Sequence, residues 1–263
     1  MLNNVAIVTG GSSGIGLEFA RQLADKGYNL LLVSNQEKEL QLAKEEILVL
    51  NHGVECMTFY SDLTEADAPE KILEFCHQNE LTVEILVNDA GIFCMKEMTA
   101  LGKGRLDLYI DLHVRAVTHL SVLFGREMAQ RKHGCILNMS SMSCWMPMPG
   151  IGMYSATKAY IRVFSRTLNL ELKESGVAVM VACPGGIATD LFGLPVKLQR
   201  LGVRLGVLAT PKSFVKGALK RLFKRKAQYI NGWLNRIAIV FVAVLPPRMR
   251  LIVKHKLLDN KND

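Results

Sequence analysis

Short apolar runs alternate with longer amphipathic runs over the first 183 residues of the chain. The short runs are rich in aliphatic and β-branched residues, which is typical of strands that are buried on both faces of a sheet. They lie at 5–9, 29–33, 54–60, 84–87, 134–139 and 177–183. Helical periodicity appears between them, at 17–28, 37–50, 64–79, 105–131 and 152–174, with a loop at 92–103. This alternation predicts one α/β domain, a doubly wound parallel sheet with right-handed crossovers and helices on both faces.

Polar or turn-forming residues follow the end of every predicted strand. These residues are Gly10, Ser34, Asp62, Asn88, Ser141 and Pro184. Ligands of doubly wound sheets bind beyond the carboxyl ends of the strands. The pattern therefore predicts a site for a nicotinamide-type dinucleotide at that edge of the sheet.

A glycine-rich turn joins the first predicted strand to the first helix. Gly10, Gly14 and Gly16 have the spacing G-x-x-x-G-x-G, which is wider than the usual G-x-G-x-x-G. Glycine permits the tight turn and the close approach of backbone to a pyrophosphate, which binds at the free N–H groups of the helix N-terminus. Ser12 and Ser13 add hydroxyl donors. Because glycine and serine also mark ordinary turns, the motif is informative only in its strand-turn-helix context.

Tyr154 and Lys158 are the candidates for acid–base chemistry. If a helix begins at Gly152, their spacing of four places them on one face, one turn apart. A nearby ammonium stabilises a phenolate, so we expect Lys158 to lower the pKa of Tyr154 from about 10. Tyr154 could then exchange a proton with an alcohol or carbonyl oxygen, which Ser141 could also hold. The alternative for such a pair taken alone is an interfacial tyrosine beside a solvated lysine.

Together these residues resemble the short-chain dehydrogenase/reductase (SDR) family from about Val5 to Thr189. The motifs are T-G-x-x-x-G-x-G at 9–16, Asp62-Leu63, N-x-A-G at 88–91, Ser141, Tyr154-x-x-x-Lys158 and P-G-x-x-x-T at 184–189. The resemblance implies a Rossmann fold with its cofactor-binding and catalytic core at 1–191. Residues 192–263 are then a basic, substrate-covering extension of the same domain. It also implies an NAD(P)-dependent oxidoreductase that interconverts a ketone or aldehyde and its alcohol.

The resemblance implies a role for each motif. Tyr154 gives or takes the proton, Lys158 tunes it and binds the nicotinamide ribose, and Ser141 bonds to the reacting oxygen, while hydride transfer belongs to the cofactor. Asp62 meets the adenine, and Asn88 braces the central strand. The implied cofactor-binding residues are Gly10, Ser12, Ser13, Gly14, Ile15, Gly16, Ser34, Asn35, Asp62, Leu63, Asn88, Ala90, Gly91, Tyr154, Lys158, Pro184, Gly185, Ile187 and Thr189.

One catalytic position departs from the family pattern. The long helix of the family carries an asparagine in a segment like D-L-N-V-x-A, whereas residues 111–116 read D-L-H-V-R-A. His113 therefore stands where that asparagine normally holds a water of the proton relay. A neutral imidazole both donates and accepts, so we expect a working but altered relay. The alternatives are a slow enzyme, or a nucleotide-binding regulatory or structural protein with little turnover.

The end of the second predicted strand bears on cofactor choice. An Asp there favours NAD and an Arg favours NADP, but the chain has Ser34 and Asn35. NADP-using relatives carry Ser-Arg at these positions, and many have a basic residue where Ser13 stands. Because no acid opposes a phosphate, the sequence slightly favours NADP(H) over NAD(H).

Charge is distributed unevenly along the chain. Residues from 196 onward contain 16 Lys/Arg and 2 Asp, whereas residues 1–195 contain 16 Lys/Arg and 22 Asp/Glu. The basic region, with an amphipathic helix at 211–226, suggests an anionic partner, and a solvated surface is the alternative. The apolar segment 237–245 is shorter than the roughly 20 residues that span a bilayer. It is expected to pack in the core, over the substrate or in a subunit interface, or else to rest on a membrane surface.

The remaining composition indicates what the protein binds and where it works. Six scattered cysteines and six dispersed histidines predict no metal and no disulfide framework, and they favour the cytoplasm, with peripheral membrane contact as the alternative. No aromatic-interleaved basic motif supports nucleic-acid binding. Methionines, Trp145 and Phe192 favour an apolar, lipid-like substrate such as a 3-ketoacyl or steroid carbonyl, covered by a lid at 192–206. The family pairs subunits through its two long helices, which implies a homodimer or homotetramer.

Overall fold

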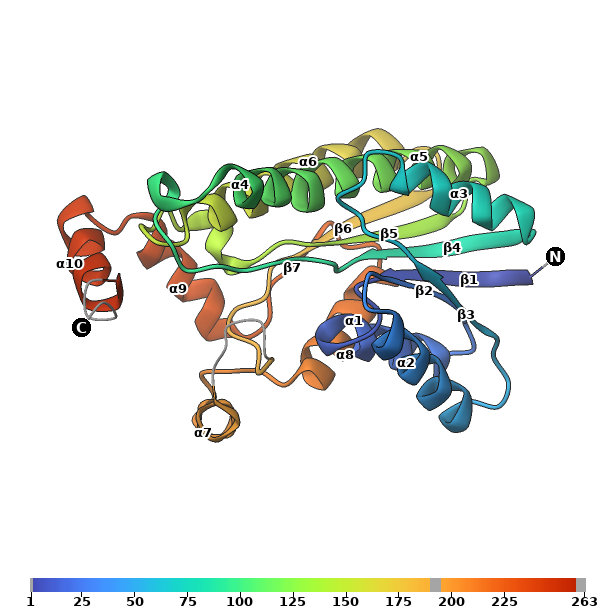
Figure 1. The fold of residues 1–263 in the computed structure, drawn as a ribbon, viewed down its shortest axis with the longest axis horizontal. Coiled ribbons are helices and arrows are strands. Elements are labelled where there is room, and N and C mark those ends of the chain that lie inside the picture. The colour runs from blue at the N-terminus through green and yellow to red at the C-terminus, as the bar shows by residue number, and fades with distance from the viewer. Residues whose placement is uncertain (1, 190–194, 259–263) are drawn as a thin grey trace.

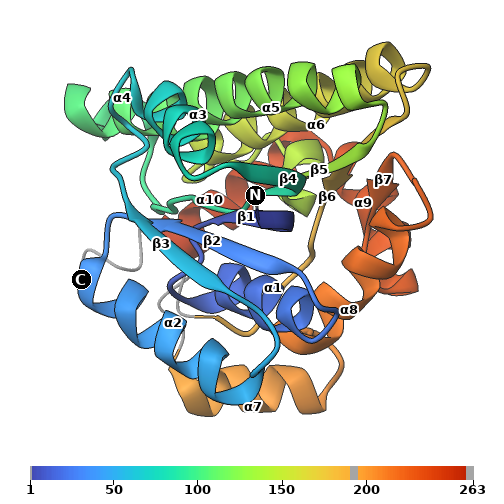
Figure 2. The ribbon, with the colours of Figure 1, turned by 90° about the vertical axis from the view of Figure 1, so that its right-hand side faces the viewer.

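The computed structural model describes residues 2–189 and 195–258, which form a seven-stranded parallel sheet between two layers of helices (Figures 1 and 2). The strand order is β3-β2-β1-β4-β5-β6-β7, so the order reverses between β1 and β4. The strands are β1 (Leu2–Thr9), β2 (Asn29–Ser34), β3 (Cys56–Tyr60), β4 (Leu81–Asn88), β5 (Gly134–Met139), β6 (Val177–Ala182) and β7 (Gln228–Tyr229). The predicted doubly wound α/β fold is confirmed.

Helices cover both faces of this sheet (Figure 1). One face carries α3 (Ala68–Gln78), α4 (Lys103–Ile110), α5 (Val117–Arg131) and α6 (Gly152–Leu172), and the other carries α1 (Gly14–Ala24), α2 (Glu37–Leu50) and α8 (Pro211–Leu222). The C-terminal part adds α7 (Val196–Arg204), α9 (Trp233–Ala243) and α10 (Pro247–Leu258). Short helical turns lie at η1 (Met98–Ala100), η2 (Asp111–Ala116) and η3 (Met142–Trp145).

The core consists of two apolar layers, one on each face of the sheet. Within β1, Ala6 and Val8 belong to the layer beneath α1, α2 and α8, while Val5 and Ile7 belong to the layer beneath α3 and α5. This alternation follows from the two-residue period of a strand. It explains why the strand reads as an unbroken apolar run, since both of its faces are buried.

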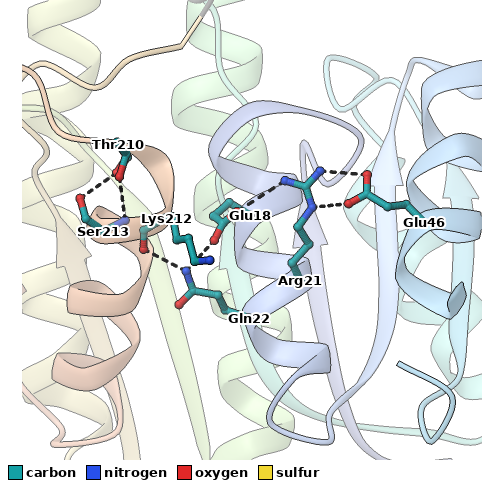
Figure 3. A network of polar contacts seen from close by, with 7 residues as sticks. All are labelled: Glu18, Arg21, Gln22, Glu46, Thr210, Lys212 and Ser213. Carbon is teal, nitrogen blue, oxygen red and sulfur yellow. Dashed lines mark hydrogen bonds and ion pairs between the residues drawn. The ribbon is translucent and has the colours of Figure 1, made fainter. Parts of the chain in front are cut away.

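A polar network connects α1 to the helices on either side of it (Figure 3). The Arg21 guanidinium donates from Nη2 to Oε2 of Glu46 on α2 at 2.9 Å. The Gln22 amide donates to the carbonyl oxygen of Lys212 on α8 at 3.0 Å. Partly exposed ion pairs contribute only about 0–1 kcal/mol each. The network therefore orients α1, which begins at the glycine turn, more than it stabilises the fold.

Two differences between the structure and the predicted elements affect the site. The helix predicted at 105–131 is a continuous run with a π-helical turn, η2, inserted between α4 and α5. Such turns add one residue to the helix and displace the side chains around it. The short strand β7 was not predicted, because two residues paired beside β6 carry no periodic pattern.

The apolar segment 237–245 is more exposed than expected. Ile239 is buried, with 8% of its surface exposed, but Phe241 is 67% exposed. Packing of the whole segment in the core of one chain is therefore wrong, while the alternatives of a place over the substrate, in a subunit interface or on a membrane stay predictions. Among the helices of the described residues, none has the length and apolar character needed to cross a membrane.

Candidate functional site

A cavity of about 290 Å³ opens beyond the carboxyl ends of β1, β4, β5 and β6. The segments at the ends of these four strands line it together with helix α6, as the sheet topology predicts. Predicted site residues that line it are Gly10, Ser13, Gly14, Ile15, Ala90, Gly91, Ser141, Tyr154, Lys158, Pro184, Gly185, Ile187 and Thr189. Asp89, Ile92, Met139 and Ser140 also line it and were not predicted. Elements far apart in the sequence thus bring most of the predicted residues to one place.

The turn before α1 requires glycine for its geometry. Gly10 and Gly14 have φ values of 68° and 57°, in the left-handed region that L side chains disfavour by about 1–2 kcal/mol. A Cβ atom on Gly16 would lie 2.2 Å from the carbonyl oxygen of Gly10. The turn leaves the first backbone N–H groups of α1 at the cavity, where Gly14 and Ile15 line the wall. These groups fit the diphosphate of a dinucleotide.

Ser141, Tyr154 and Lys158 meet at the cavity and are almost completely buried. Ser141 follows β5, and the other two lie one turn apart on α6. The Lys158 Nζ atom lies 5.6 Å from the centre of the Tyr154 ring and donates to the carbonyl oxygen of Met139 at 2.9 Å. The arrangement joins a proton donor, a hydroxyl and an ammonium at one end of the cavity.

The expected acidification of Tyr154 is wrong for this structure. Burial raises the pKa of Tyr154 to about 12, and the hydrogen bond from Ser141 opposes this only in part. The same burial lowers the pKa of Lys158 to about 8, with the Asp89 carboxylate acting in the other direction. Desolvation disfavours the charged form of each group and outweighs the contacts that favour it, from Ser141 for the phenolate and from Asp89 for the ammonium. At neutral pH the phenol is therefore protonated, which is the form that can donate a proton to a carbonyl oxygen.

Asp89 is a half-buried acid at the cavity that the sequence analysis missed. It lies between Asn88 and Ala90, and the backbone N–H of Gly16 donates to its carboxylate. Burial raises the pKa of Asp89 to about 7, while the ammonium of Lys158 lowers it. Its position near the end of a predicted strand could have indicated that it belongs to the site.

Both ring nitrogens of His113 are used within the protein. Nε2 accepts from the backbone N–H of Ile92 at 3.0 Å, and Nδ1 lies 3.0 Å from the Thr157 hydroxyl. That hydroxyl donates to the carbonyl oxygen of Tyr154 at 3.0 Å, so it accepts from Nδ1–H. Burial and then the charge of Lys158 lower the pKa of His113, in agreement with a neutral ring. His113 thus holds the loop after β4 against α6, and the predicted relay through the ring requires one of these bonds to open.

A polar group lies at the ends of β1, β2 and β3, outside the residues that line the cavity. The hydroxyls of Ser12 and Ser34 are 2.8 Å apart, and Asn35 donates to the carboxylate of Asp62. The backbone N–H of Thr64 contributes most to lowering the pKa of Asp62. Leu63, in contrast, is part of the core layer beneath α3. These positions fit the adenosine end of a dinucleotide, with the hydroxyls at the place that distinguishes NAD from NADP.

Asn88 connects the middle of the sheet to the helices above it. Its amide donates to Oδ1 of Asn138 on β5 at 2.8 Å and to the hydroxyl of Ser121 on α5 at 3.2 Å. Asn138 in turn donates to Ser165 on α6 at 2.9 Å. Buried amides that are partnered in this way fix neighbouring elements relative to one another. This contact is the bracing that the family resemblance implies.

Two asparagines that the sequence analysis missed hold the turn after β6. Oδ1 of Asn231 accepts from the backbone N–H of Gly185 at 2.8 Å. A Cβ atom on Gly185 would lie 2.3 Å from the Asn235 amide, so the start of α9 packs directly on this turn. Both residues follow β7, and their positions could not be inferred while that strand was missing.

The predicted lid lies only partly in the described residues. Phe192 is outside them, and α7, which starts at Val196, does not line the cavity. Figure 1 shows α7 set apart from the sheet. The lid and the contact of Phe192 with substrate stay predictions. Within residues 2–189 and 195–258, no group of three or more acidic, histidine or cysteine side chains is arranged to hold a metal.

Comparison with known proteins places these features in a family. The family described as short chain dehydrogenase matches residues 4–195, which include all six motifs of the resemblance. A very-long-chain 3-oxoacyl-CoA reductase of Neurospora crassa is 31% identical over 221 residues, which cover 82% of this chain and 64% of that protein. The chain thus spans less than two thirds of that relative.

Two further similarities bear on activity and cofactor. Inactive hydroxysteroid dehydrogenase-like protein 1 of Homo sapiens is 30% identical over 246 residues, covering 92% of this chain and 72% of that protein. The structure of a short-chain dehydrogenase from Sphingobium yanoikuyae in complex with NADPH superimposes with a TM-score of 0.79 at 25% identity, and covers 95% of both chains. The comparisons thus include one relative named as a reductase, one named as inactive, and one structure with a bound nicotinamide cofactor.

Proposed function

This chain belongs to the short-chain dehydrogenase/reductase family, and we propose that it is an NAD(P)-dependent oxidoreductase that interconverts an apolar ketone or aldehyde and its alcohol. Tyr154 is the general acid and base. The observation that carries the proposal is the meeting of Ser141, Tyr154 and Lys158 in the cavity beside the glycine turn. Three groups from two elements, all buried, are more than a chance tyrosine-lysine pair on a helix surface.

The residues of the chain have distinct parts in this reaction. The first turn of α1 binds the diphosphate, the segment from Pro184 to Thr189 holds the nicotinamide, and Lys158 binds the ribose hydroxyls. The bound nicotinamide supplies or accepts the hydride. Tyr154, protonated at neutral pH, donates its proton to the carbonyl oxygen, to which Ser141 also donates a hydrogen bond.

The pKa of Tyr154 favours one direction of the reaction. A pKa of about 12 keeps the phenol protonated through the neutral range, which suits reduction of a carbonyl. Alcohol oxidation needs the phenolate, so its rate should rise with pH while the rate of reduction should not. A pH profile with parallel slopes in both directions would contradict this assignment.

Different relatives support the proposed substrate class and the rival function. The name of the Neurospora crassa protein supports a long-chain acyl carbonyl as substrate. The name of the human relative supports a nucleotide-binding protein with little turnover. This chain keeps Ser141, Tyr154 and Lys158 at the cavity, which favours the enzyme.

Oxidation of NADPH with a panel of ketones and aldehydes tests the proposal. Tyr154→Phe should lower kcat/KM by about 10²–10⁴, the usual contribution of a general acid. Tyr160→Phe is the matched control, because Tyr160 lies on the same helix with its hydroxyl 2.8 Å from that of Thr118, away from the cavity. If NADPH binds but no member of the panel is reduced, the binding protein becomes the better interpretation.

We also propose that the chain prefers NADP(H). The hydroxyls of Ser12 and Ser34 lie together at the end of β2, and the nearby Asp62 is engaged with Asn35 and Thr64. Hydroxyl donors without an opposing free acid suit a 2′-phosphate. Dissociation constants measured by fluorescence titration should be several-fold lower for NADPH than for NADH. A lower value for NADH would reverse the preference.

Assembly into a homodimer or homotetramer is a further part of the proposal. Val163 and Leu170 on α6 are exposed large apolar residues, and α6 packs beside α5 on one face of the sheet. Exposed apolar faces of this kind mark subunit interfaces. Light scattering of the purified chain should give a mass of two or four subunits. A monomer at micromolar concentration would contradict this.

Peripheral membrane contact is proposed for the two C-terminal helices. Trp233 and Phe241 on α9 and Met249 on α10 are exposed, and Arg248 and Arg250 lie in the same region. Exposed apolar side chains beside basic ones suit the surface of an anionic bilayer. The protein would otherwise stay in the cytoplasm, which the free cysteines favour. Sedimentation with anionic liposomes at low salt tests the contact, and a failure to bind removes it.

A further inference from the structure

Cys144 and Cys183 form a pair of thiols outside the residues that line the cofactor cavity. Cys183 follows β6 and is completely buried, while Cys144 lies on η3, the helical turn that follows Ser141. Both cysteines are free, and Cys144 packs against the small core cluster that contains Cys183. The two side chains are hydrogen-bonded, with the Cys183 thiol as the donor. Two thiols from different elements thus meet beside the catalytic residues.

Backbone contacts fix the position of Cys183. Its N–H donates to the carbonyl oxygen of Tyr229 on β7 at 2.8 Å. The carbonyl oxygen of Pro184, the next residue, accepts from the N–H of Met142 at 2.8 Å. Cys144, in contrast, lies on a single short helical turn beside a cavity. We therefore expect the turn that carries Cys144 to adjust more easily than the strand end that carries Cys183.

The two thiols differ in their access to solvent. Cys144 is only partly buried and lines a second cavity, which lies beside the loop that joins β5 to α6. Among the described residues this cavity shares no lining residue with the cofactor cavity. Cys183, in contrast, has no exposed surface. A small molecule in the second cavity can thus contact Cys144 but not Cys183.

The surroundings of Cys144 favour its thiolate. The hydrogen bond from Cys183 lowers the pKa of Cys144, and the charge of Arg162 acts in the same direction, against the effect of burial. The guanidinium of Arg162 lies over the Trp145 ring, 4.4 Å from its centre. The hydrogen bond to Cys144, and then burial, raise the pKa of Cys183. An accessible thiolate beside a second cysteine is the arrangement that hydroperoxides oxidise selectively.

We propose that Cys144 and Cys183 are a thiol-oxidation site, where a hydroperoxide joins the two sulfurs as a disulfide that draws η3 towards β6 and lowers turnover. With hydrogen peroxide, the Cys144 thiolate takes an OH group as the O–O bond breaks, and the hydroxide that leaves takes up a proton. The Cys183 sulfur then attacks the resulting sulfenic acid. The S–S bond forms, the S–O bond breaks, and the second hydroxide leaves as water with the proton of Cys183. The sulfurs together lose two electrons, which the peroxide accepts.

The disulfide acts on Ser141 through η3. It brings the sulfurs to about 2.05 Å, much closer than a hydrogen bond between two thiols allows. The N–H of Cys144 donates to the carbonyl oxygen of Ser141, and the N–H of Ser143 donates to the Ser141 hydroxyl, both at 3.1 Å. A displaced η3 therefore moves the Ser141 hydroxyl relative to Tyr154, and a misplacement of about 1 Å can cost about 10²-fold in rate. The disulfide is independent of the proposed function, on which only the change in turnover rests.

Peptide mapping by mass spectrometry after a brief treatment with hydrogen peroxide tests the disulfide without a measurement of turnover. Without reductant, trypsin should release the peptides of Cys144 and Cys183 as one bridged pair, because it cuts after Lys158 and other basic residues between them. Dithiothreitol should separate the pair by thiol–disulfide exchange. An unbridged Cys144, or a bridge from Cys144 to another cysteine, would overturn the proposal.

Cysteine variants separate the two steps of the oxidation. Cys183→Ala should leave the Cys144 sulfenic acid without its partner, so that dimedone labels Cys144 after peroxide. Cys144→Ala should give neither a bridge nor a label on Cys183. Cys94→Ala is the matched control, because Cys94 is also partly buried, and it should form the bridge as the parent does. A dimedone label on Cys183 in Cys144→Ala would contradict the proposed order. If Cys183→Ala does not fold, the bridge in the parent and its loss in Cys144→Ala still decide the question.

Fluorescence of Trp145 measures the movement of η3 whether or not a substrate is turned over. Trp233→Phe removes the other tryptophan of the chain. In this background peroxide should shift the emission of Trp145, dithiothreitol should reverse the shift, and the additional change Cys144→Ala should prevent it. A bridged chain with unchanged emission would refute the displacement of η3.

Turnover of NADPH with the best carbonyl compound of the panel measures the consequence of the disulfide. The bridged parent should have a kcat/KM at least about tenfold lower than the reduced parent. Dithiothreitol should restore it, and Cys144→Ala should keep its own rate after the same treatment. Equal values for the bridged and reduced parent would overturn the effect on turnover. A reduced parent that turns over no carbonyl compound would instead refute the proposed function, while the peptide map and Trp145 still decide the oxidation site.

Discussion

The polar groups of the two cavities beside the β5–α6 loop differ in whether they have hydrogen-bond partners within the chain. In the cofactor cavity the charged groups have partners within the chain: the buried Lys158 donates to Met139, and the half-buried Asp89 accepts from Gly16. The second cavity, of about 600 Å³, is lined by Met98, Met146 and Met148 and is called the methionine chamber here. Ser143 and Ser155 also line it, and their buried hydroxyls are unpartnered within the described residues. The charged groups of the first cavity thus have at least one partner each, whereas the two hydroxyls of the second have none among the described residues.

The walls of the two cavities also differ in how freely their side chains can move. A side chain at Gly91 would approach Nε2 of His113 to 3.0 Å, so the cofactor cavity has no room for change there. Methionines and the exposed edge of α10 form the methionine chamber and can move. A tightly packed site fixes the reacting atoms, whereas a wall of flexible side chains tolerates changes of shape. Substitutions should therefore abolish chemistry in the first cavity and alter stability in the second.

The largest expected effect is the loss of the buried ammonium. Lys158→Met should lower kcat/KM by about 10²–10³, comparable to removing one preorganised charged or hydrogen-bonding group from a transition state. It should also change the pH dependence of folding. Because the pKa of Lys158 is lowered to about 8, the unfolded chain binds the proton more tightly, and wild-type stability rises with pH from 8 towards 10.5. Denaturation between these pH values should show that this rise is lost in the variant.

Lys173→Met is the matched control for Lys158→Met. Lys173 follows the end of the same helix and is exposed. This variant should keep both the activity and the pH dependence of the wild type. If Lys158→Met retains full kcat/KM, the cofactor cavity does not depend on its buried charge, and the contrast with the chamber fails.

Asp89→Asn should have the next largest effect, on stability. The pKa of Asp89 is raised to about 7 by burial, so the folded chain holds this proton more tightly than the unfolded chain. Wild-type stability therefore falls as pH rises from about 4 to 7 and stays lower above 7. The variant should lack this fall and be more stable at pH 8, on the order of 1–4 kcal/mol. Urea denaturation at pH 5 and pH 8 measures it.

The surface acid Asp107 provides the control for Asp89. It pairs with Lys103 at 2.8 Å on α4, where solvent screens the charges. Asp107→Asn should change the difference between pH 5 and pH 8 very little. A loss of stability in Asp89→Asn at pH 8 would instead mean that attraction to Lys158 exceeds the desolvation of the carboxylate.

Most of the cofactor cavity could be predicted from the sequence because its geometry is local to strand ends. In a parallel sheet the carboxyl ends lie on one edge, so Gly10, Ser141 and Pro184 had to approach one another once the strands were recognised. The protonation of Tyr154 could not be predicted in the same way. It depends on how deeply the phenol is buried, and spacing along a helix gives only its distance from Lys158.

The methionine chamber, in contrast, could not be predicted from the sequence. Leu251 and Met98 are about 150 positions apart but line the same cavity, and Arg250, next to Leu251, donates to the carbonyl oxygen of Pro147 in the loop before α6. The short strand β7 and the π turn η2 also carry no periodic pattern, so the positions of Asn231 and His113 were uncertain. Local repeats predict elements, but long-range contacts between loops need the folded chain.

Substitutions of two serines on α6 should change the free energy of unfolding by smaller amounts and in opposite directions. Ser155 has a buried, unpartnered hydroxyl, whereas the Ser165 hydroxyl donates to Ile161 and accepts from Asn138 at 2.9 Å. Ser155→Ala should raise the free energy of unfolding by about 1 kcal/mol, and Ser165→Ala should lower it by about 1–2 kcal/mol. Thermal denaturation without ligand compares them. A fall in both variants would show that the Ser155 hydroxyl has a partner in solution.

The smallest effect on activity is expected from His113→Asn. An asparagine can replace one of the two bonds that the ring makes, to the Ile92 amide or to Thr157, but its shorter side chain cannot replace both. Turnover should therefore stay within about threefold of the wild type or rise, as the family pattern implies, while about 1 kcal/mol of stability is lost with the missing bond. Steady-state kinetics and urea denaturation of the same preparation separate the two effects.

His119→Asn is the control for His113→Asn, because His119 lies on the surface near Glu70, away from the cavity. His119→Asn should change neither the turnover nor the free energy of unfolding. A collapse of turnover in His113→Asn with its fold intact would give the ring a specialised part in proton transfer. The neutral ring would then have to open one of its two bonds, to the Ile92 amide or to Thr157, during the reaction.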